Sequence, residues 1–210
     1  MSRRPNLEDA YALSSKQDVK DLYSDWAQSY DTGFSDAQGY QMPRVVAQAF
    51  VAAGGVGPVL DVGAGTGLVA EQLIAAGVSV IDGLDLSDDM LAVARAKGVY
   101  RCLYTGDITV PLSLPKVGYQ GVVSAGTFTH GHVGPVALDE LLRIAKPGAL
   151  FCLSINLEHF ESAGFKQKLK EIGDDIDNLS LQTVPIYMQG PVGKHANDLG
   201  VIVLFHKAPT

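Results

Sequence analysis

The stretch VLDVGAGTGLVA, residues 59–70, decides the fold of this chain. It begins with apolar residues typical of a buried strand, breaks at three glycines that alternate with small residues, and continues as an apolar helical pattern from Leu68. A strand that enters a helix through a glycine-rich turn is the first unit of a doubly wound α/β sheet, and such a turn lets a nucleotide-like ligand approach the backbone. We therefore predict a ligand site at this turn, around Gly63, Gly65 and Gly67.

The composition of the chain fits one globular domain. Its 210 residues, of which 47% are hydrophobic, are enough for a full core in a single unit. The net charge of −7, with 16 Lys and Arg against 23 Asp and Glu, argues against a surface that follows the phosphates of DNA or RNA. No apolar run approaches the roughly 20 residues of a membrane span, and residues 1–15 lack the apolar core of a secretory signal. We expect a cytoplasmic protein, monomeric or homodimeric, without a nucleic-acid or membrane partner.

The cysteines and the C-terminal histidines show no metal-binding pattern. Cys102 and Cys152 both lie in apolar, strand-like runs, so we expect them to be buried free thiols. His159, His195 and His206 are scattered along the chain without the spacing of metal ligands. We therefore predict neither a disulfide nor a metal site.

The N-terminal region, residues 1–55, is expected to be helical. Residues 18–31 place apolar side chains at helical spacing, which gives the predicted helix an aromatic face with Tyr23, Trp26 and Tyr30. This face either fixes the helix to the domain or belongs to a lid over the ligand site, in which case Trp26 and Tyr30 contact the ligand. A second helix is predicted to begin at Pro43 and to stop at Gly54.

The next predicted strand, residues 78–85, narrows the choice of ligand. It ends at Asp85, which lies 20 residues after Gly65, and a carboxylate there can accept hydrogen bonds from both hydroxyls of a ribose. A dinucleotide and S-adenosylmethionine both fit this pattern. However, a dinucleotide fingerprint needs a glycine at position 68, which is Leu68, and Asp61 would repel a pyrophosphate. A ligand with an amino group and a sulfonium would instead use Asp61, directly or through water.

Four motifs lie in order along residues 56–155. They are DVGAGTG at 61–67, DLS at 85–87 followed by Met90, GD at 106–107, and LLRIAKPGA at 141–149. In their order and spacing, these motifs resemble those of the class I S-adenosylmethionine-dependent methyltransferases, in particular the methyltransferase type 11 group. The pairs Trp26-Ala27 and Tyr30-Asp31, the loop GTFTHGHVGP and the segment AGFKQKLK are also similar to a narrower branch, the Williams–Beuren-region methyltransferase-like proteins.

The resemblance implies which residues contact S-adenosylmethionine. The glycines of the turn approach its methionine part, and Asp85 binds the ribose. Leu86 and Met90 pack on the adenine ring, and Asp107, with Ile108 beside it, accepts a hydrogen bond from the exocyclic amine; a purely structural turn is the alternative for Asp107. In full, the expected cofactor-binding residues are Asp61, Gly63, Ala64, Gly65, Gly67, Asp85, Leu86, Met90, Asp107, Ile108 and Ser124, with Trp26 and Tyr30 from the lid.

The loop after the predicted fourth strand, residues 121–125, is the candidate substrate side of the site. In an open α/β sheet, ligands lie in the crevice beyond the strand ends. The imidazole of His130 can take a proton from an attacking oxygen or nitrogen, so His130 is the candidate catalytic residue, with a structural role in the loop as an equal alternative. Methyl transfer depends mainly on alignment of the reactants, so it does not require a dedicated base.

Together these patterns predict an α/β fold, a Rossmann-like doubly wound sheet of seven strands that is mostly parallel, with an antiparallel last strand and an N-terminal helical lid. We expect one domain, with the lid and entry helices in residues 1–55, the cofactor-binding core in 56–155, and one helix (160–172) with a hairpin in 156–210. The predicted function is methyl transfer from S-adenosylmethionine to an oxygen, nitrogen or carbon of a small molecule, which leaves S-adenosylhomocysteine. A non-catalytic cofactor-binding protein and an NAD-dependent oxidoreductase are the alternatives.

Overall fold

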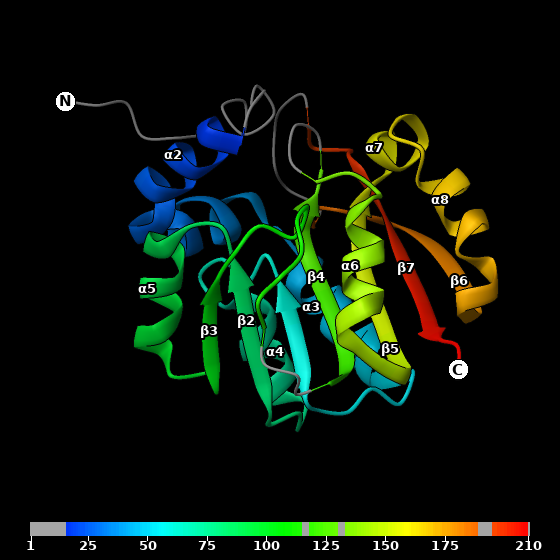
Figure 1. Ribbon diagram of the computed structural model, residues 1–210. Coiled ribbons are helices and arrows are strands. Elements are labelled where there is room, and N and C mark those ends of the chain that lie inside the picture. The colour runs from blue at the N-terminus through cyan, green and yellow to red at the C-terminus, as the bar shows by residue number, and fades with distance from the viewer. Residues whose placement is uncertain (1–15, 115–117, 130–132, 189–194, 210) are drawn as a thin grey trace.

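The computed structural model describes residues 16–114, 118–129, 133–188 and 195–209. In these ranges the chain forms a seven-stranded sheet in the order β3-β2-β1-β4-β5-β7-β6. The first five strands are parallel, and β7 runs antiparallel to its neighbours β5 and β6 (Figure 1). The predicted fold class is therefore confirmed. The strands are β1 (Val59–Val62), β2 (Ile81–Asp85), β3 (Cys102–Thr105), β4 (Tyr119–Phe128), β5 (Ala145–Asn156), β6 (Ile176–Pro185) and β7 (Leu199–Lys207).

Helices cover both faces of the sheet. One face packs against α3 and α4 through strand residues such as Val59 and Val123, and the other packs against α6, α7 and α8 through Leu60 and Val122. Neighbouring strand residues belong to opposite clusters because side chains alternate along a strand. None of the helices in the described ranges is long and apolar enough to cross a membrane. The helices are α3 (Met42–Ala52), α4 (Leu68–Ala75), α5 (Asp88–Lys97), α6 (Ala137–Ile144), α7 (Leu157–Ser162) and α8 (Phe165–Glu171).

The glycine turn between β1 and α4 takes a backbone conformation that glycine adopts easily. Gly63, Gly65 and Gly67 have φ angles of 68°, 52° and 96°. The N–H groups of Gly63 and Ala64 donate to the carbonyl of Leu84 at 2.8 and 3.0 Å, which fixes the turn against β2. The predicted strand–turn–helix unit is therefore confirmed.

The N-terminal region differs from the single helix predicted over residues 18–31. It consists of α2 (Lys16–Trp26), a 3-10 turn η1 (Ala27–Ser29) and a π-helical segment η2 (Asp31–Asp36). The prediction of one regular helix was wrong because distant contacts set the backbone here. Asp31 forms an ion pair with Lys97 at 2.6 Å, and the Phe34 ring is buried at 6% exposure.

Two further predictions were wrong. The helix predicted over 160–172 is two helices, α7 and α8, because Gly164 between them has a φ of 89°. Residues 156–210 therefore hold two helices and a hairpin rather than one helix. Cys102 is an exposed free thiol rather than a buried one, because β3 is the edge strand of the sheet, whereas Cys152 is buried and free as predicted.

Candidate functional site

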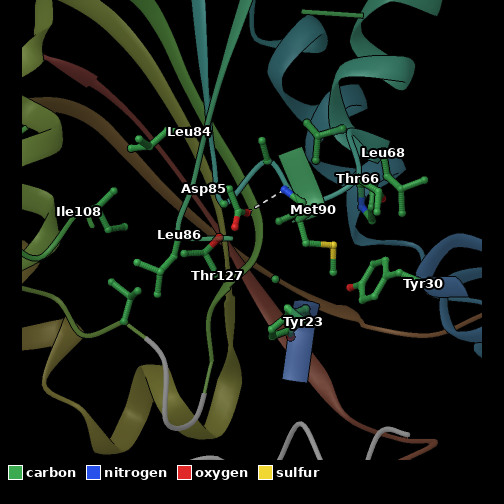
Figure 2. Close-up of a pocket in the computed structure, with 18 of the residues that line it drawn as sticks. Tyr23, Tyr30, Thr66, Leu68, Leu84, Asp85, Leu86, Met90, Ile108 and Thr127 are labelled. Carbon is green, nitrogen blue, oxygen red and sulfur yellow. Dashed lines mark hydrogen bonds between the residues drawn. The ribbon is translucent and has the colours of Figure 1, made fainter. Parts of the chain in front are cut away.

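A cavity lies at the carboxyl ends of β1, β2 and β4, and we call it the main cavity. It has a volume of about 1030 Å³, including the open space at its mouth. Its walls come from the glycine turn, the end of β2, residues 106–109 and the end of β4 at 125–127. Figure 2 shows Asp85 on one side, with Tyr23 and Tyr30 of the N-terminal segment across the cavity from it. Its position beyond the strand ends, where ligands of open α/β sheets bind, agrees with the prediction.

Asp85 joins two parts of the wall of the main cavity. Its Oδ2 accepts a hydrogen bond from the Gly65 N–H and its Oδ1 accepts one from the Ser87 N–H, both at 2.8 Å. Burial raises the pKa of this carboxyl, while the backbone donors at Ser87, Gly65 and Leu86 lower it. Each carboxylate oxygen can accept a second hydrogen bond, so Asp85 can also bind two hydroxyls of a ligand.

The neighbouring wall combines apolar side chains with a second carboxyl group. Leu86, Met90 and Ile108 line the main cavity, and Met90 and Ile108 are only 2% and 6% exposed. Asp107 lines it as well, and its Oδ1 accepts from the N–H and the hydroxyl of Thr109 at 2.8 and 2.6 Å. This turn is the structural role considered for Asp107. A flat ring with one polar edge fits such a wall.

Asp61 is the second-to-last residue of β1, close to the glycine turn, and is not part of the wall of the main cavity. Its side chain is fully buried. Its Oδ2 accepts from the Tyr100 hydroxyl at 2.6 Å, and its Oδ1 has no hydrogen-bond partner among the described residues. Burial raises the pKa of Asp61 to about 7; the Tyr100 hydroxyl lowers it and the charge of Asp85 raises it. An unpaired buried carboxyl oxygen is costly, so a positively charged group beside Asp61 would gain a favourable interaction.

The N-terminal segment covers the main cavity as a lid. Figure 1 shows α2 beyond the arrowheads of β2 and β3, beside α5. The Thr66 hydroxyl of the glycine turn donates to Asp31 at 2.5 Å, and the same carboxylate pairs with Lys97 of α5. After the lid, Tyr40 pairs with Tyr187 in an antiparallel bridge. These contacts connect the lid to the turn, to α5 and to the segment after β6.

A second cavity adjoins the main cavity, with a volume of about 570 Å³ that includes the open space at its mouth, and we call it the aromatic chamber. The two share Tyr23, Tyr30, Tyr40 and Gly126 as lining residues, so the three tyrosines lie on the boundary between them. Hydroxyl or amide side chains supply the polar part of its wall. The chamber adds the rings of Trp26, Phe34, Phe128 and Tyr187, and the polar side chains of Thr129, Ser154 and Asn156.

Comparison with known proteins gives the family. Residues 60–153 match the family model described as a methyltransferase domain. Over 169 residues, the chain is 32% identical to methyltransferase-like protein 27 of Homo sapiens, a match that covers 76% of this chain and 68% of the human protein. The chain belongs to the S-adenosylmethionine-dependent methyltransferases. The resemblance of the four sequence motifs is therefore confirmed, as is the similarity to methyltransferase-like proteins.

Solved structures share the fold of this methyltransferase at low sequence identity. Magnesium protoporphyrin IX methyltransferase from Synechocystis PCC 6803, with bound S-adenosylmethionine, is 19% identical with a TM-score of 0.65; the match covers 97% of this chain and 100% of that one. A chain of the complex between the Haloferax volcanii Trm112 methyltransferase activator and a putative methyltransferase is also 19% identical with a TM-score of 0.65, over 90% of this chain and 98% of that one. These likenesses support the fold.

The main cavity fits S-adenosylmethionine on three observations. The Asp85 carboxylate can accept hydrogen bonds from two ribose hydroxyls. The apolar wall with Met90 and Ile108 suits the adenine ring. Asp61 lies outside the cavity wall, but the negative charge of its unpaired Oδ1 would favour a positively charged amino group near the glycine turn, directly or through water.

Most of the predicted cofactor contacts lie in the wall of the main cavity. Trp26 lines the aromatic chamber instead, while Asp61, Gly67 and Ser124 line neither cavity; the Ser124 hydroxyl donates to the carbonyl of Val62 at 2.7 Å. His130 lies outside the described residues, so its role as a base stays a prediction. The predicted residues that line the main cavity are Tyr30, Gly63, Ala64, Gly65, Asp85, Leu86, Met90, Asp107 and Ile108.

Thr127, from the loop predicted as the substrate side, and Tyr40 are two lining residues that the expected cofactor contacts did not include. Thr127 lines the main cavity because β4 continues to Phe128, three residues beyond its predicted end. Tyr40 lines both cavities, held by its bridge to Tyr187. A long-range pairing of this kind leaves no local pattern, and the only signal was the aromatic content of the segment before Pro43.

Removal of the Asp85 carboxylate is expected to weaken the binding of S-adenosylhomocysteine. Asp85→Ala should raise the calorimetric Kd by a factor that corresponds to about 1–3 kcal/mol, because buried ribose hydroxyls would lose their acceptor. Asp88→Ala, which removes an exposed carboxylate outside both cavities, is the matched control and should leave Kd unchanged. Equal Kd values for Asp85→Ala and the unmodified chain would contradict the ribose assignment.

Proposed function

We propose that this methyltransferase acts on a small molecule that enters the aromatic chamber. The observation that carries the proposal is the boundary between the two cavities, where Tyr23, Tyr30 and Tyr40 line both. A cofactor in the main cavity would therefore be adjacent to a second cavity lined mainly by aromatic rings, which can bury a small acceptor. The net charge of −7 does not favour an RNA or DNA acceptor.

In this proposal, the residues of the chain bind and orient the two reactants. Asp85 binds the ribose, Leu86 and Met90 with Ile108 hold the adenine, and Asp61 favours the charged amino group. When bound, S-adenosylmethionine supplies a methyl group on a sulfonium that is already activated for transfer. The lid with Tyr23 and Tyr30 excludes water from the reactants. Alignment of the two reactants provides most of the rate enhancement.

The acceptor proton is the remaining chemical requirement of this proposal. An acceptor hydroxyl or amine must lose a proton when its oxygen or nitrogen gains the methyl group. We propose His130 as the base, since an imidazole titrates near neutral pH. The proposal also includes a monomeric or homodimeric protein without nucleic-acid or membrane partners.

Calorimetry and turnover together test the proposed function. We expect S-adenosylhomocysteine to bind and NAD to show no heat, because Leu68 stands where the dinucleotide fingerprint needs its third glycine and the turn begins two residues after Asp61. Methyl transfer from labelled S-adenosylmethionine should appear with members of a small-molecule panel and not with total RNA or a denatured protein extract. Transfer to RNA or protein alone would overturn the small-molecule proposal, and NAD binding would overturn the cofactor assignment.

A further inference from the structure

The aromatic chamber is uncharged in the part of the chain that the structure describes. Its lining consists of aromatic rings, the apolar side chains of Met42 and Ile186, and hydroxyl or amide groups. Burial raises the pKa of the Tyr23, Tyr30 and Tyr40 hydroxyls, which therefore stay neutral at physiological pH. An anionic acceptor would lose its hydration in this chamber without gaining a cationic partner.

The rings of the chamber form a connected cluster that suits flat ligands. The ring centroids of Trp26 and Phe34 are 4.9 Å apart. The rings of Trp26 and Tyr30 meet edge to face, with centroids 5.4 Å apart and planes at 84°. At the other end, the Tyr40 and Tyr187 centroids are 6.1 Å apart. Aromatic rings attract each other in offset or edge-to-face arrangements within these distances. A planar aromatic ligand would extend this cluster, whereas a saturated ring of equal size would gain only burial.

Two polar side chains on β5 add a hydrogen-bonding position to the wall of the aromatic chamber. Ser154 and Asn156 are two residues apart on one strand, so their side chains point to the same face of the sheet. They are only 5% and 8% exposed, and both line the chamber. The Asn156 Oδ1 accepts from the His159 N–H at 3.1 Å, but the Asn156 amide N–H₂ and the Ser154 hydroxyl have no hydrogen-bond partner among the described residues.

We propose that the acceptor is a neutral, planar aromatic molecule with a hydroxyl group, stacked among the rings of the chamber with that hydroxyl bound to Ser154 and Asn156. The inference rests on the proposed function, since it names the substrate class of the same site. The chemistry of methyl transfer adds a reason against a cationic amine: a protonated nitrogen has no lone pair to form a bond with a methyl carbon. The uncharged lining disfavours an anion and the need for a lone pair disfavours a protonated amine, so an uncharged acceptor remains.

Binding of three matched probes tests the substrate class without turnover. The probes are 4-methylphenol, 4-methylbenzoate and 4-methylcyclohexanol, added to the chain saturated with S-adenosylhomocysteine. Binding is followed by calorimetry and by the fluorescence of Trp26, the only tryptophan in the chain and a lining residue of the chamber. We expect 4-methylphenol to quench the fluorescence of Trp26. It should bind about tenfold tighter than 4-methylbenzoate, an anion without a cationic partner in the chamber, and about threefold tighter than 4-methylcyclohexanol, whose ring is saturated.

Two variants connect the phenol to the chamber. Ser154→Ala should weaken 4-methylphenol about fivefold through the lost hydrogen bond and leave toluene, which has no hydroxyl, unchanged. Ser162→Ala, an exposed serine outside both cavities, is the matched control. Tyr187→Ala should weaken the binding of both 4-methylphenol and toluene, because Tyr187 lines the chamber. The Kd of S-adenosylhomocysteine should stay the same, because Tyr187 does not line the main cavity.

The outcomes separate this inference from the proposed function. If S-adenosylhomocysteine binds but 4-methylbenzoate binds as tightly as 4-methylphenol, the neutral aromatic class is wrong and the methyltransferase assignment stands. If S-adenosylhomocysteine binds and no probe changes Trp26 fluorescence, the chamber is not the aromatic acceptor site. If S-adenosylhomocysteine itself does not bind, the proposed function fails first.

Discussion

Replacement of Gly63 by Ala is expected to destabilise the folded chain by about 2–5 kcal/mol and to abolish binding of S-adenosylhomocysteine. Two costs combine at this position. Gly63 has a φ of 68°, a conformation that costs an L residue about 1–2 kcal/mol. In addition, a Cβ on Gly63 would lie 1.8 Å from the Thr127 Oγ1. Either the Thr127 side chain would have to rotate and lose its hydrogen bond to the Val62 carbonyl, or β4 and the turn would have to separate. Chemical denaturation measures the stability, and calorimetry measures the binding.

A matched glycine separates the two costs. Gly98 has a φ of 67°, but a Cβ there meets no atom within 4 Å. Gly98→Ala should therefore cost only the backbone strain and leave cofactor binding intact. The double variant with Gly63→Ala and Thr127→Ala should recover part of the stability, because it removes the clashing hydroxyl. Equal losses for the Gly63 and Gly98 variants would show that the close approach of Thr127 does not matter.

The turn and the carboxylate at the end of β2 could be predicted because their signals are local. Glycines at 63, 65 and 67 are required by the backbone itself, and the 20-residue step to Asp85 follows from one strand, one helix and the next strand. The hydrogen bond from the Gly65 N–H to Asp85 spans the same 20 residues. Such features depend on the spacing of residues along the chain, so they can be recognised as motifs in the sequence.

The parts that could not be predicted depend on contacts between distant segments. The helix predicted over 18–31 changes to a 3-10 and then a π-helical segment where Asp31 meets Thr66 and Lys97. Trp26 has the helical spacing of a lid residue, yet only the packing of the lid against Phe34 places it in the chamber rather than the main cavity. Periodicity predicts which face of a helix is apolar, but not which of two adjoining cavities that face meets.

Replacement of Asp61 by Asn is expected to stabilise the cofactor-free chain increasingly as the pH rises from about 4 to about 7. In the unfolded chain this carboxyl has a pKa of about 3.9, whereas burial raises it to about 7 in the folded chain. Between these values the folded state holds one proton more than the unfolded state, so the free energy of unfolding falls as the pH rises through this window. Asn keeps the shape and cannot ionise, so the difference between variant and unmodified chain should grow by about 2–4 kcal/mol.

Unfolding in the presence of S-adenosylhomocysteine tests whether the ionised Asp61 serves to bind the amino group of the cofactor. Urea unfolding at pH 4 and pH 8 gives the growth of the difference, with the exposed Asp174→Asn as a control that should show none. Saturating S-adenosylhomocysteine should shrink the growth, because its amino group would compensate the ionised Asp61, whose Oδ1 has no partner among the described residues. A difference that does not change with pH would mean that the hydrogen bond from Tyr100 outweighs burial. A growth that persists unchanged with ligand would place the amino group elsewhere and leave Asp61 with a structural role alone.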